Sequence, residues 1–364
     1  MASTRLRRIF IPLPPAPTPP SAANCGGDPR SAQSWAGRLA RFRKPSVSRA
    51  VIEVTITVAP LIAISVLAWE ALHHHIWWGL LLIPLAAAFL TRLFLIQHDC
   101  GHGAFTPWQG LNDWLGRVIG VFTLTPYDYW RRAHALHHAT SGALDRRTIG
   151  GIDTLTVDEY LALSAWRRFG YWLYRHPLVM FGLGPAFVFL IQHRLPVGMM
   201  RQGWRPWIST LATDLGVAVL AVAMALIFGI GPFLLIYLPV VMLAASVGVW
   251  LFFVQHQFED TYWARDPAWE FHEAAFRGSS HYDLPAVLRW FTANIGIHHV
   301  HHLSSRIPYY RLGQVMREEP ELRAAGRLTL VQSFRCVGLA LWDDASRRLI
   351  SFRELRRRRL APAV

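Results

Sequence analysis

The chain has 364 residues, of which 52% are hydrophobic and only 16% are charged. Soluble proteins of this length carry about a quarter charged residues, so the composition excludes an ordinary soluble domain and indicates an integral membrane protein. The formal net charge of +14 could suggest a nucleic-acid partner, but membrane proteins also gather arginine at the cytoplasmic lipid surface. We therefore expect a membrane contact and no nucleic acid. The three cysteines are far apart, which excludes a disulfide framework.

The N-terminal segment differs in composition from the rest of the chain. Residues 1–45 are rich in Pro, Ala, Ser and Arg, and prolines interrupt the short apolar stretch near the start. This pattern lacks the apolar core of a signal peptide. We expect a disordered, Pro/Arg-rich cytoplasmic tail over residues 1–45, followed by one membrane domain over residues 46–364.

Four apolar stretches are each about the 20 residues needed to cross a hydrocarbon core about 30 Å thick. They cover residues 51–72, 76–96, 207–228 and 232–254. A further stretch, residues 177–191, is shorter and is interrupted by glycine and proline. Its length leaves open whether it crosses the membrane.

Three short histidine clusters stand out, because nine of the 17 histidines fall in residues 98–102, 134–138 and 298–302. Residues four apart lie on one face of a helix, so each cluster can direct its imidazoles to one place. Imidazole is the commonest protein ligand for mid-series transition metals. The clustered histidines outnumber the ligands that a single ion of ordinary coordination binds. We therefore predict a two-metal centre built from eight histidines: His98, His102, His134, His137, His138, His298, His301 and His302.

The number of crossings between the clusters decides the topology. If all three clusters build one centre, they must lie on the same side of the bilayer, which two crossings between residues 138 and 298 satisfy and three do not. We therefore expect residues 177–191 to be interfacial or re-entrant. Arginine is absent from the short links at 72–75 and 229–231, which places the termini and the clusters in the cytoplasm. The predicted fold is an all-α membrane protein, with four transmembrane helices and a histidine-rich helical cytoplasmic cap holding the dimetal site.

The ligand types narrow the choice of metal. Thiolates are few and no carboxylate cage is evident, whereas an all-nitrogen environment suits iron. Copper and zinc remain open on ligand type alone. A pair of irons at the membrane boundary can activate O₂, and the substrate concentrated there is a lipid acyl chain.

The spacings H-x3-H, H-x2-HH and H-x2-HH resemble those of the membrane-bound fatty acid desaturases. Longer strings resemble the Δ12/ω-3 acyl-lipid branch of that family: Gln255–Trp263, Gly278–Ser280, Tyr282–Pro285 and Trp290–Gly296. The resemblance implies two non-haem irons and O₂-dependent formation of a cis double bond in a membrane acyl chain. It also implies a separate electron carrier, such as ferredoxin or cytochrome b5, because the sequence shows no fused haem motif and no dinucleotide fingerprint.

By this resemblance the eight cluster histidines match the family's metal ligands. Related desaturases have a further ligand just after the last span, and His256 occupies that place in this sequence. Metal-bound histidines usually donate their second ring N–H to an oxygen, and six residues are candidates for this role: Asp99, Asp128, Glu259, Asp260, Asp283 and Asn294. Asn294 lies four residues before His298, so it could also bind a metal through water. His281 and His299 fall outside the ligand spacing.

Two other classes of function remain open from the sequence. A related diiron hydroxylase, epoxygenase, acetylenase or carotenoid-modifying oxygenase would share the clusters but change the product. A non-catalytic membrane metal-binding protein or transporter is the other alternative. Transport paths normally need ionisable groups inside the spans, and here the histidines gather at the ends of the spans instead.

Overall fold

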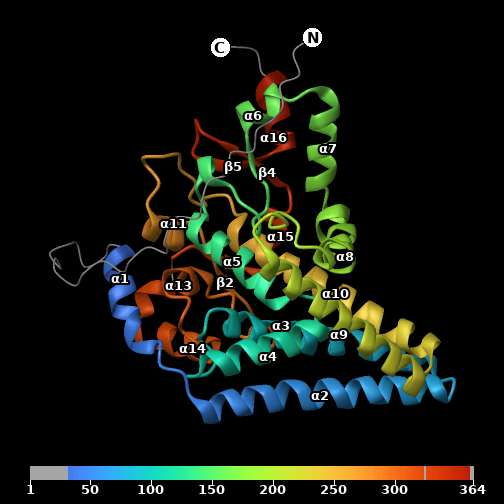
Figure 1. Cartoon of the computed structure of the whole chain (residues 1–364). Helices are drawn as coiled ribbons and strands as arrows, with labels where there is room; N and C mark the ends of the chain where they lie inside the picture. The colour runs from blue at the N-terminus through green and yellow to red at the C-terminus, as the bar shows by residue number, and fades with distance from the viewer. Residues whose placement is uncertain (1–31, 324, 361–364) are drawn as a thin grey trace.

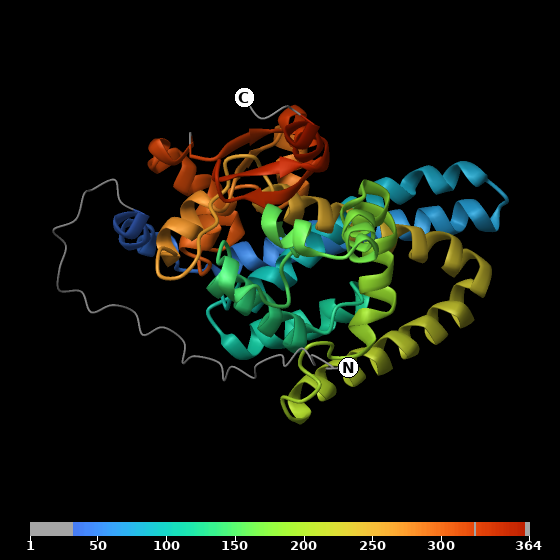
Figure 2. The same ribbon diagram turned by 90° about the horizontal axis from the view of Figure 1, so that it is seen from above.

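The computed structural model describes residues 32–323 and 325–360. Four long helices are apolar enough to cross a membrane and project toward the same end of the molecule (Figure 1; Figure 2). They are α2 (Val47–His73), α3 (Ile83–Gly101, continued from the 3₁₀ helix η2, Trp77–Leu82), α9 (Trp204–Phe228) and α10 (Ile230–His256). The four predicted spans are confirmed. The helices α3 and α10 pack against each other and end beside the histidines.

A bent pair of helices precedes α9. The helix α7 (Ala165–Arg175) is followed, after a short break at Pro177, by a second helical stretch that turns by 62°. This stretch contains the π-helical turn η4 (Val179–Leu183), α8 (Gly184–Leu190) and η5 (Gln192–Arg194). Proline lacks the backbone N–H that continues a helix, which accounts for the break. The pair has the form of a broken span or a re-entrant loop, so the interfacial placement of residues 177–191 stays a prediction.

The shorter helices gather at the other end of the molecule and around the ends of the spans (Figure 1). They are α4 (Gln109–Phe122), α5 (Tyr127–Thr140), η3 (Leu144–Arg146), α6 (Val157–Ala162), α11 (Phe271–Arg277), α12 (Ala286–Phe291), α13 (His298–Leu303), α14 (Tyr309–Glu318), η6 (Pro320–Arg323), α15 (Leu330–Cys336) and α16 (Phe352–Leu360). The predicted helical cap is confirmed.

Two small sheets reinforce this cap. In the first, β1 (Leu155–Thr156) pairs in parallel with β4 (Leu339–Asp343), and β4 pairs antiparallel with β5 (Arg348–Ser351). In the second, β2 (His281–Asp283) pairs in parallel with β3 (Arg327–Thr329). These strands are too short to carry a clear alternation of apolar and polar residues, so the sequence did not predict them.

The predicted disordered tail is wrong for residues 32–42. There the structure contains α1 (Ala32–Leu39) and the 3₁₀ turn η1 (Ala40–Phe42), and α1 packs against α11 and α13. Trp35, Leu39 and Phe42 are buried at helical spacing, so one apolar face holds the segment in place. The prediction of disorder rested on the overall composition of residues 1–45, in which arginines and small residues outnumber these three apolar residues. Residues 1–31 of the predicted tail lie outside the described residues.

A buried ion pair ties two spans to the segments on either side of the third histidine cluster. The guanidinium of Arg92 in α3 donates to the Glu53 carboxylate of α2, and both side chains are only 2–3% exposed. Arg92 also donates to the backbone oxygen of Trp290 in α12, and the Tyr309 hydroxyl of α14 donates to Glu53 at 3.1 Å. Buried charges are tolerated only when they are paired and hydrogen-bonded, so this network fixes how α12 and α14 meet the spans.

Replacing Arg92 by methionine should destabilise the protein, because it leaves part of the buried Glu53 charge without a partner. Loss of one member of a buried pair typically costs about 3–5 kcal/mol. Denaturant unfolding of the detergent-solubilised full chain measures this loss. Arg117→Met is the matched control, because the Arg117–Asp128 pair is 42% and 38% exposed and such pairs contribute about 0–1 kcal/mol. Equal losses in the two variants would contradict a structural role for the buried pair.

Candidate metal centre

Four helix ends bring the histidines together. His98 lies in the last turn of α3, and the backbone N–H of His102 caps that helix by donating to the His98 oxygen at 3.2 Å. The helix α5 carries the second cluster, the six-residue helix α13 carries the third, and α10 ends at His256. The centre therefore depends on segments that are distant in the sequence but meet where two spans end.

The nine histidines form two groups. Within each group the possible ligand atoms all lie within 4.8 Å of one another. The first group is His98, His102, His134, His138 and His301, and the second is His137, His256, His298 and His302. The structure thus brings together all nine residues that the sequence analysis singled out, including His256.

The second and third clusters are each shared between the groups, so the expectation that each cluster points to one place is wrong for both. His134 and His138 belong to the first group, whereas His137 belongs to the second. In α13, His301 is likewise separated from its neighbours. Residues four apart differ by about 40° around a helix, and residues three apart differ by about 60° in the opposite sense. A cluster with both spacings therefore faces two neighbouring points, and each helix spans both groups.

The distances within the first group do not describe an ordinary hydrogen-bond network. The Nε2 atom of His134 lies 3.0 Å from that of His98, 3.1 Å from that of His102 and 3.1 Å from that of His138. One imidazole nitrogen carries either one proton or one lone pair, so it cannot satisfy three such neighbours. Two nitrogens bound about 2.1 Å from one cation at a right angle would be about 3.0 Å apart. The ring positions therefore fit lone pairs directed at a shared cation.

The second group has the same spacing. The Nε2 atom of His256 lies 3.0 Å from that of His298 and 3.1 Å from that of His137, and His302 Nε2 lies 3.1 Å from His298 Nε2. Together the two groups present Nε2 from all nine residues. Because Nε2 faces the group in every ring, Nδ1 is left available for a hydrogen bond to an oxygen atom of the protein.

Burial keeps the imidazoles in the form that binds a metal. For the cluster histidines outside the spans, removal from water lowers the pKa well below its ordinary value. Repulsion between neighbouring imidazolium charges lowers the pKa further in this set: His102, His134, His137, His138, His298, His301 and His302. A neutral imidazole has the free lone pair that a metal requires. At neutral pH the residues therefore fit a cation-binding centre.

Two oxygen atoms lie at the Nδ1 side of the ligand histidines. Gly278 accepts a hydrogen bond from His256 Nδ1 at 3.0 Å, which leaves His256 Nε2 free to face the second group. Asp99 Oδ1 lies 3.5 Å from His98 Nδ1, and Asp99 Oδ2 accepts from the Tyr309 backbone N–H at 2.7 Å. His98 Nδ1 has no hydrogen-bond partner among the described residues, although Asp99 was among the predicted acceptors. The Gly278 carbonyl was not among them, because a backbone oxygen has no signature in the sequence.

The other predicted acceptors have different partners in the structure. Asp128 pairs with Arg117, Glu259 with Arg348 and Asp283 with Arg327, and Asp260 is exposed. The Asn294 side chain donates to the Tyr309 backbone oxygen at 3.3 Å. Proximity in sequence was therefore a poor guide to these contacts, because arginines from other segments take the carboxylates.

Backbone contacts orient the third cluster. The N–H groups of His298 and His299 donate to the Ser280 oxygen at 3.2 and 3.3 Å, which anchors the start of α13. The His299 ring faces away from both groups, with Nε2 3.0 Å from the Leu322 oxygen. His281 Nδ1 lies 2.9 Å from the Arg323 oxygen. The structure thus places His281 and His299 outside the groups.

A small cavity of about 40 Å³ borders the second group. His137 and His256 form part of its wall, and Phe252, Ile152 and Trp263 are among the apolar residues that close it. A void of this size has room for a small molecule such as water or O₂. Sequence reasoning did not single out Ile152 or Phe252, because nothing in their local pattern distinguishes them from ordinary core positions, whereas Trp263 ends one of the strings that resemble the desaturases.

Comparison with known proteins agrees with this geometry. The family model described as fatty acid desaturase matches residues 75–334. A "Fatty acid desaturase" of Bacillus subtilis (strain 168) is 41% identical over 319 residues, covering 88% of this chain and 90% of the relative. An "sn-1 acyl-lipid omega-3 desaturase (ferredoxin)" of Synechocystis sp. (strain ATCC 27184 / PCC 6803 / Kazusa) is 28% identical, covering 60% and 61%. An "sn-1 oleoyl-lipid 12-desaturase" of Anabaena variabilis is 26% identical, covering 64% and 67%.

The family model covers both histidine groups and the helices α3 and α10 that end beside them, and the Bacillus subtilis relative matches over 88% of this chain. The chain therefore belongs to the fatty acid desaturase family.

Proposed function

We propose that this protein is an O₂-dependent diiron desaturase that introduces a cis double bond into a membrane acyl chain. The observation that carries the proposal is the pair of histidine groups, in which nine imidazoles direct Nε2 at two neighbouring points. The family assignment supports the oxidoreductase class. The Synechocystis and Anabaena relatives support reaction at the Δ12 or ω-3 position.

In this proposal the first group holds one iron and the second group holds the other. The two irons would supply the activation of O₂ that removal of unactivated hydrogens requires. The all-nitrogen donor set favours iron over calcium or magnesium, which prefer oxygen ligands. The Gly278 carbonyl fixes the orientation of the His256 ring, and Asp99 lies where it can do the same for His98.

The stoichiometry requires a partner that supplies electrons. Reduction of O₂ to two waters consumes four electrons and four protons, of which the acyl chain supplies two of each when its double bond forms. The other two electrons come from a separate carrier of the ferredoxin or cytochrome b5 type, and the other two protons come from solvent. The printed name of the Synechocystis relative supports ferredoxin.

We place the two groups, and with them both chain termini, on the cytoplasmic side. All nine histidines gather at one end of the span bundle, which agrees with a single side of the membrane. Arginine-rich segments lie at that end, whereas the links between paired spans at the other end lack arginine. The cavity beside His137 and His256 adjoins the second group and gives O₂ a place to reach it.

Removing one histidine from either group should abolish desaturation. His137→Ala takes one of four ligands from the second group, and His301→Ala takes one of five from the first. We expect the iron content to fall from two per chain toward one, together with complete loss of product. Iron analysis of the purified variants measures the first effect, and fatty-acid methyl ester profiles of the expressing cells measure the second.

His74→Gln is the matched control, because His74 is exposed at the opposite end of α2 and outside both groups. It should retain iron and activity. Full iron occupancy in both the His137→Ala and His301→Ala variants would contradict the ligand assignment.

Expression in a host that lacks polyunsaturated lipids tests the reaction itself. With a ferredoxin and its reductase present, we expect a new cis double bond in the membrane acyl chains, and removal of iron by a chelator should prevent it. Double-bond location by mass spectrometry identifies the position. A product that retains an oxygen atom would instead identify a hydroxylase or another oxygenase built on the same centre.

A further inference from the structure

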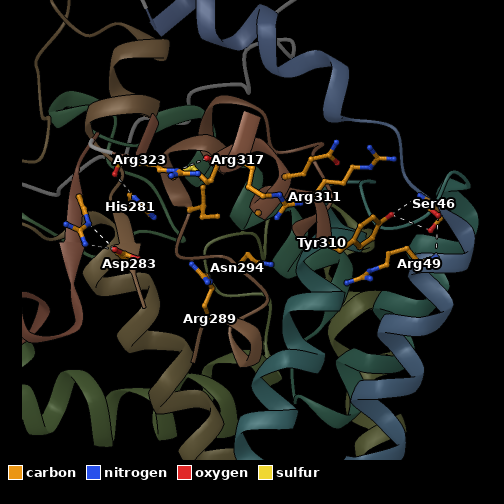
Figure 3. Close-up of a pocket in the computed structure, with 15 residues that line it drawn as sticks. Ser46, Arg49, His281, Asp283, Arg289, Asn294, Tyr310, Arg311, Arg317 and Arg323 are labelled. Atoms are coloured by element: carbon orange, nitrogen blue, oxygen red, sulfur yellow. Dashed lines mark hydrogen bonds and ion pairs between the residues drawn. The ribbon is translucent and has the colours of Figure 1, made fainter. Parts of the chain in front are cut away.

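A large basic hollow lies beside the metal centre. Its volume is about 1100 Å³, and six arginines line it together with one aspartate, Asp283. The arginines are Arg49, Arg289, Arg311, Arg317, Arg323 and Arg327. Figure 3 shows Arg49 at one side of the hollow and His281 and Asp283 at the other, with Arg289 and Arg311 between them. None of these residues belongs to the two histidine groups.

Most of this positive charge lacks a carboxylate partner among the described residues. Arg49 pairs with Glu53, which Arg92 also uses, and Arg327 pairs with Asp283. Among the residues that the structure describes, Arg289, Arg311, Arg317 and Arg323 form no ion pair, and Arg323 instead donates to the Met316 backbone oxygen at 2.8 Å. These four guanidinium groups without ion-pair partners line one hollow and favour the binding of an anion there. The planar guanidinium group can donate two parallel hydrogen bonds to phosphate oxygens, which makes phosphate a good match.

The length of α2 indicates that the hollow lies near the depth of lipid headgroups. The helix α2 has 27 residues and is therefore about 40 Å long, which exceeds the hydrocarbon core and extends into the headgroup layer. Arg49 lies in the first turn of α2, at this boundary. On the other side, Arg289 belongs to α12, whose Val287 and Leu288 are exposed apolar residues that suit a lipid-facing surface.

The wall of the hollow is linked to the metal centre. Asn294, which lines the hollow, donates to the Tyr309 oxygen, and the Tyr309 N–H donates to Asp99 beside His98. A headgroup held in the hollow would therefore place its glycerol and acyl chains close to the ligand helices.

We propose that this hollow binds the phosphate of a phospholipid headgroup, and that this phospholipid carries the acyl chain to be desaturated. The second half of the proposal rests on the proposed function. A recessed site suits a small anionic group better than a folded acidic protein, because a stable protein interface needs about 800 Å² of matching surface on each partner. Arginine contacts here select phosphate-bearing lipids over neutral glycolipids with the same acyl chains.

The test uses the purified full chain in detergent and compares the wild type with the triple variant Arg289→Gln/Arg311→Gln/Arg317→Gln. Mixed micelles containing dioleoylphosphatidylglycerol are the phosphate-bearing probe, and micelles containing monogalactosyl dioleoylglycerol are the phosphate-free probe. We expect the Kd for the phosphatidylglycerol to rise on the order of tenfold to 100-fold in the variant, with no change for the galactolipid. The control Arg356→Gln/Arg357→Gln/Arg359→Gln removes the same charge from α16 and should change neither Kd.

Two soluble probes and one protein probe separate other sources of the anion. Inorganic phosphate and coenzyme A should bind much more weakly than the lipid; if coenzyme A binds as tightly and loses affinity equally in the variant, a soluble thioester occupies the hollow. If only binding of purified ferredoxin weakens, the hollow is a docking site for the electron carrier. Unchanged phosphatidylglycerol binding in the variant would also overturn the proposal.

Turnover separates this proposal from the proposed function. With phosphatidylglycerol as substrate, the variant should show a raised KM, a kcat within about twofold of the wild type and unchanged iron content. A wild type that binds the phospholipid but carries no iron or forms no double bond would refute the proposed function and leave the phosphate site standing. An unchanged KM in an active, iron-loaded variant would refute the substrate assignment.

Discussion

The structure depends on the convergence of nine imidazole nitrogens that face one another inside the protein. Neutral rings with Nε2 atoms about 3.0–3.2 Å apart repel unless a cation lies between them, so the rest of the fold must hold them in place. Two kinds of support do this. Hydrogen bonds to backbone oxygens orient individual rings, as at Gly278, and the buried Glu53–Arg92 pair sets the spans against the segments flanking α13. A metal centre in this family member is therefore as much a property of helix packing as of the ligands themselves.

Helix geometry explains why three clusters serve two sites rather than three. Because α5 and α13 each carry ligands at spacings of three and four, each helix contacts both groups, and the separation of the two points is fixed by the width of a rigid helix. A pair of metals held by separate loops could drift apart. Here a shift of either helix would disturb both groups together, which couples the two sites mechanically.

Arginine occupies three different environments in this chain. Arg92 is buried and neutralised by Glu53 within the spans, where an unpaired charge would be costly. Arginines at the surface of the cap, such as Arg348, form exposed pairs that contribute little to stability. Arg289, Arg311 and Arg317 line the hollow without carboxylate partners among the described residues, so their charge is available to a ligand.

The resemblance to known desaturases indicated the place of His256. The sequence by itself determined the four spans and the histidine spacing, because hydrophobic length and helical periodicity are local properties. It did not reveal that His137 and His301 each belong to a different histidine group from the other ligands of their helix. That assignment depends on which face of α5 packs against which face of α13. It also assigned Glu259 and Asp283 to the centre, whereas arginines distant in sequence take both carboxylates. Only the tertiary structure decided these contacts, and the burial of α1, because they join segments whose separation along the chain carries no information about their distance in space.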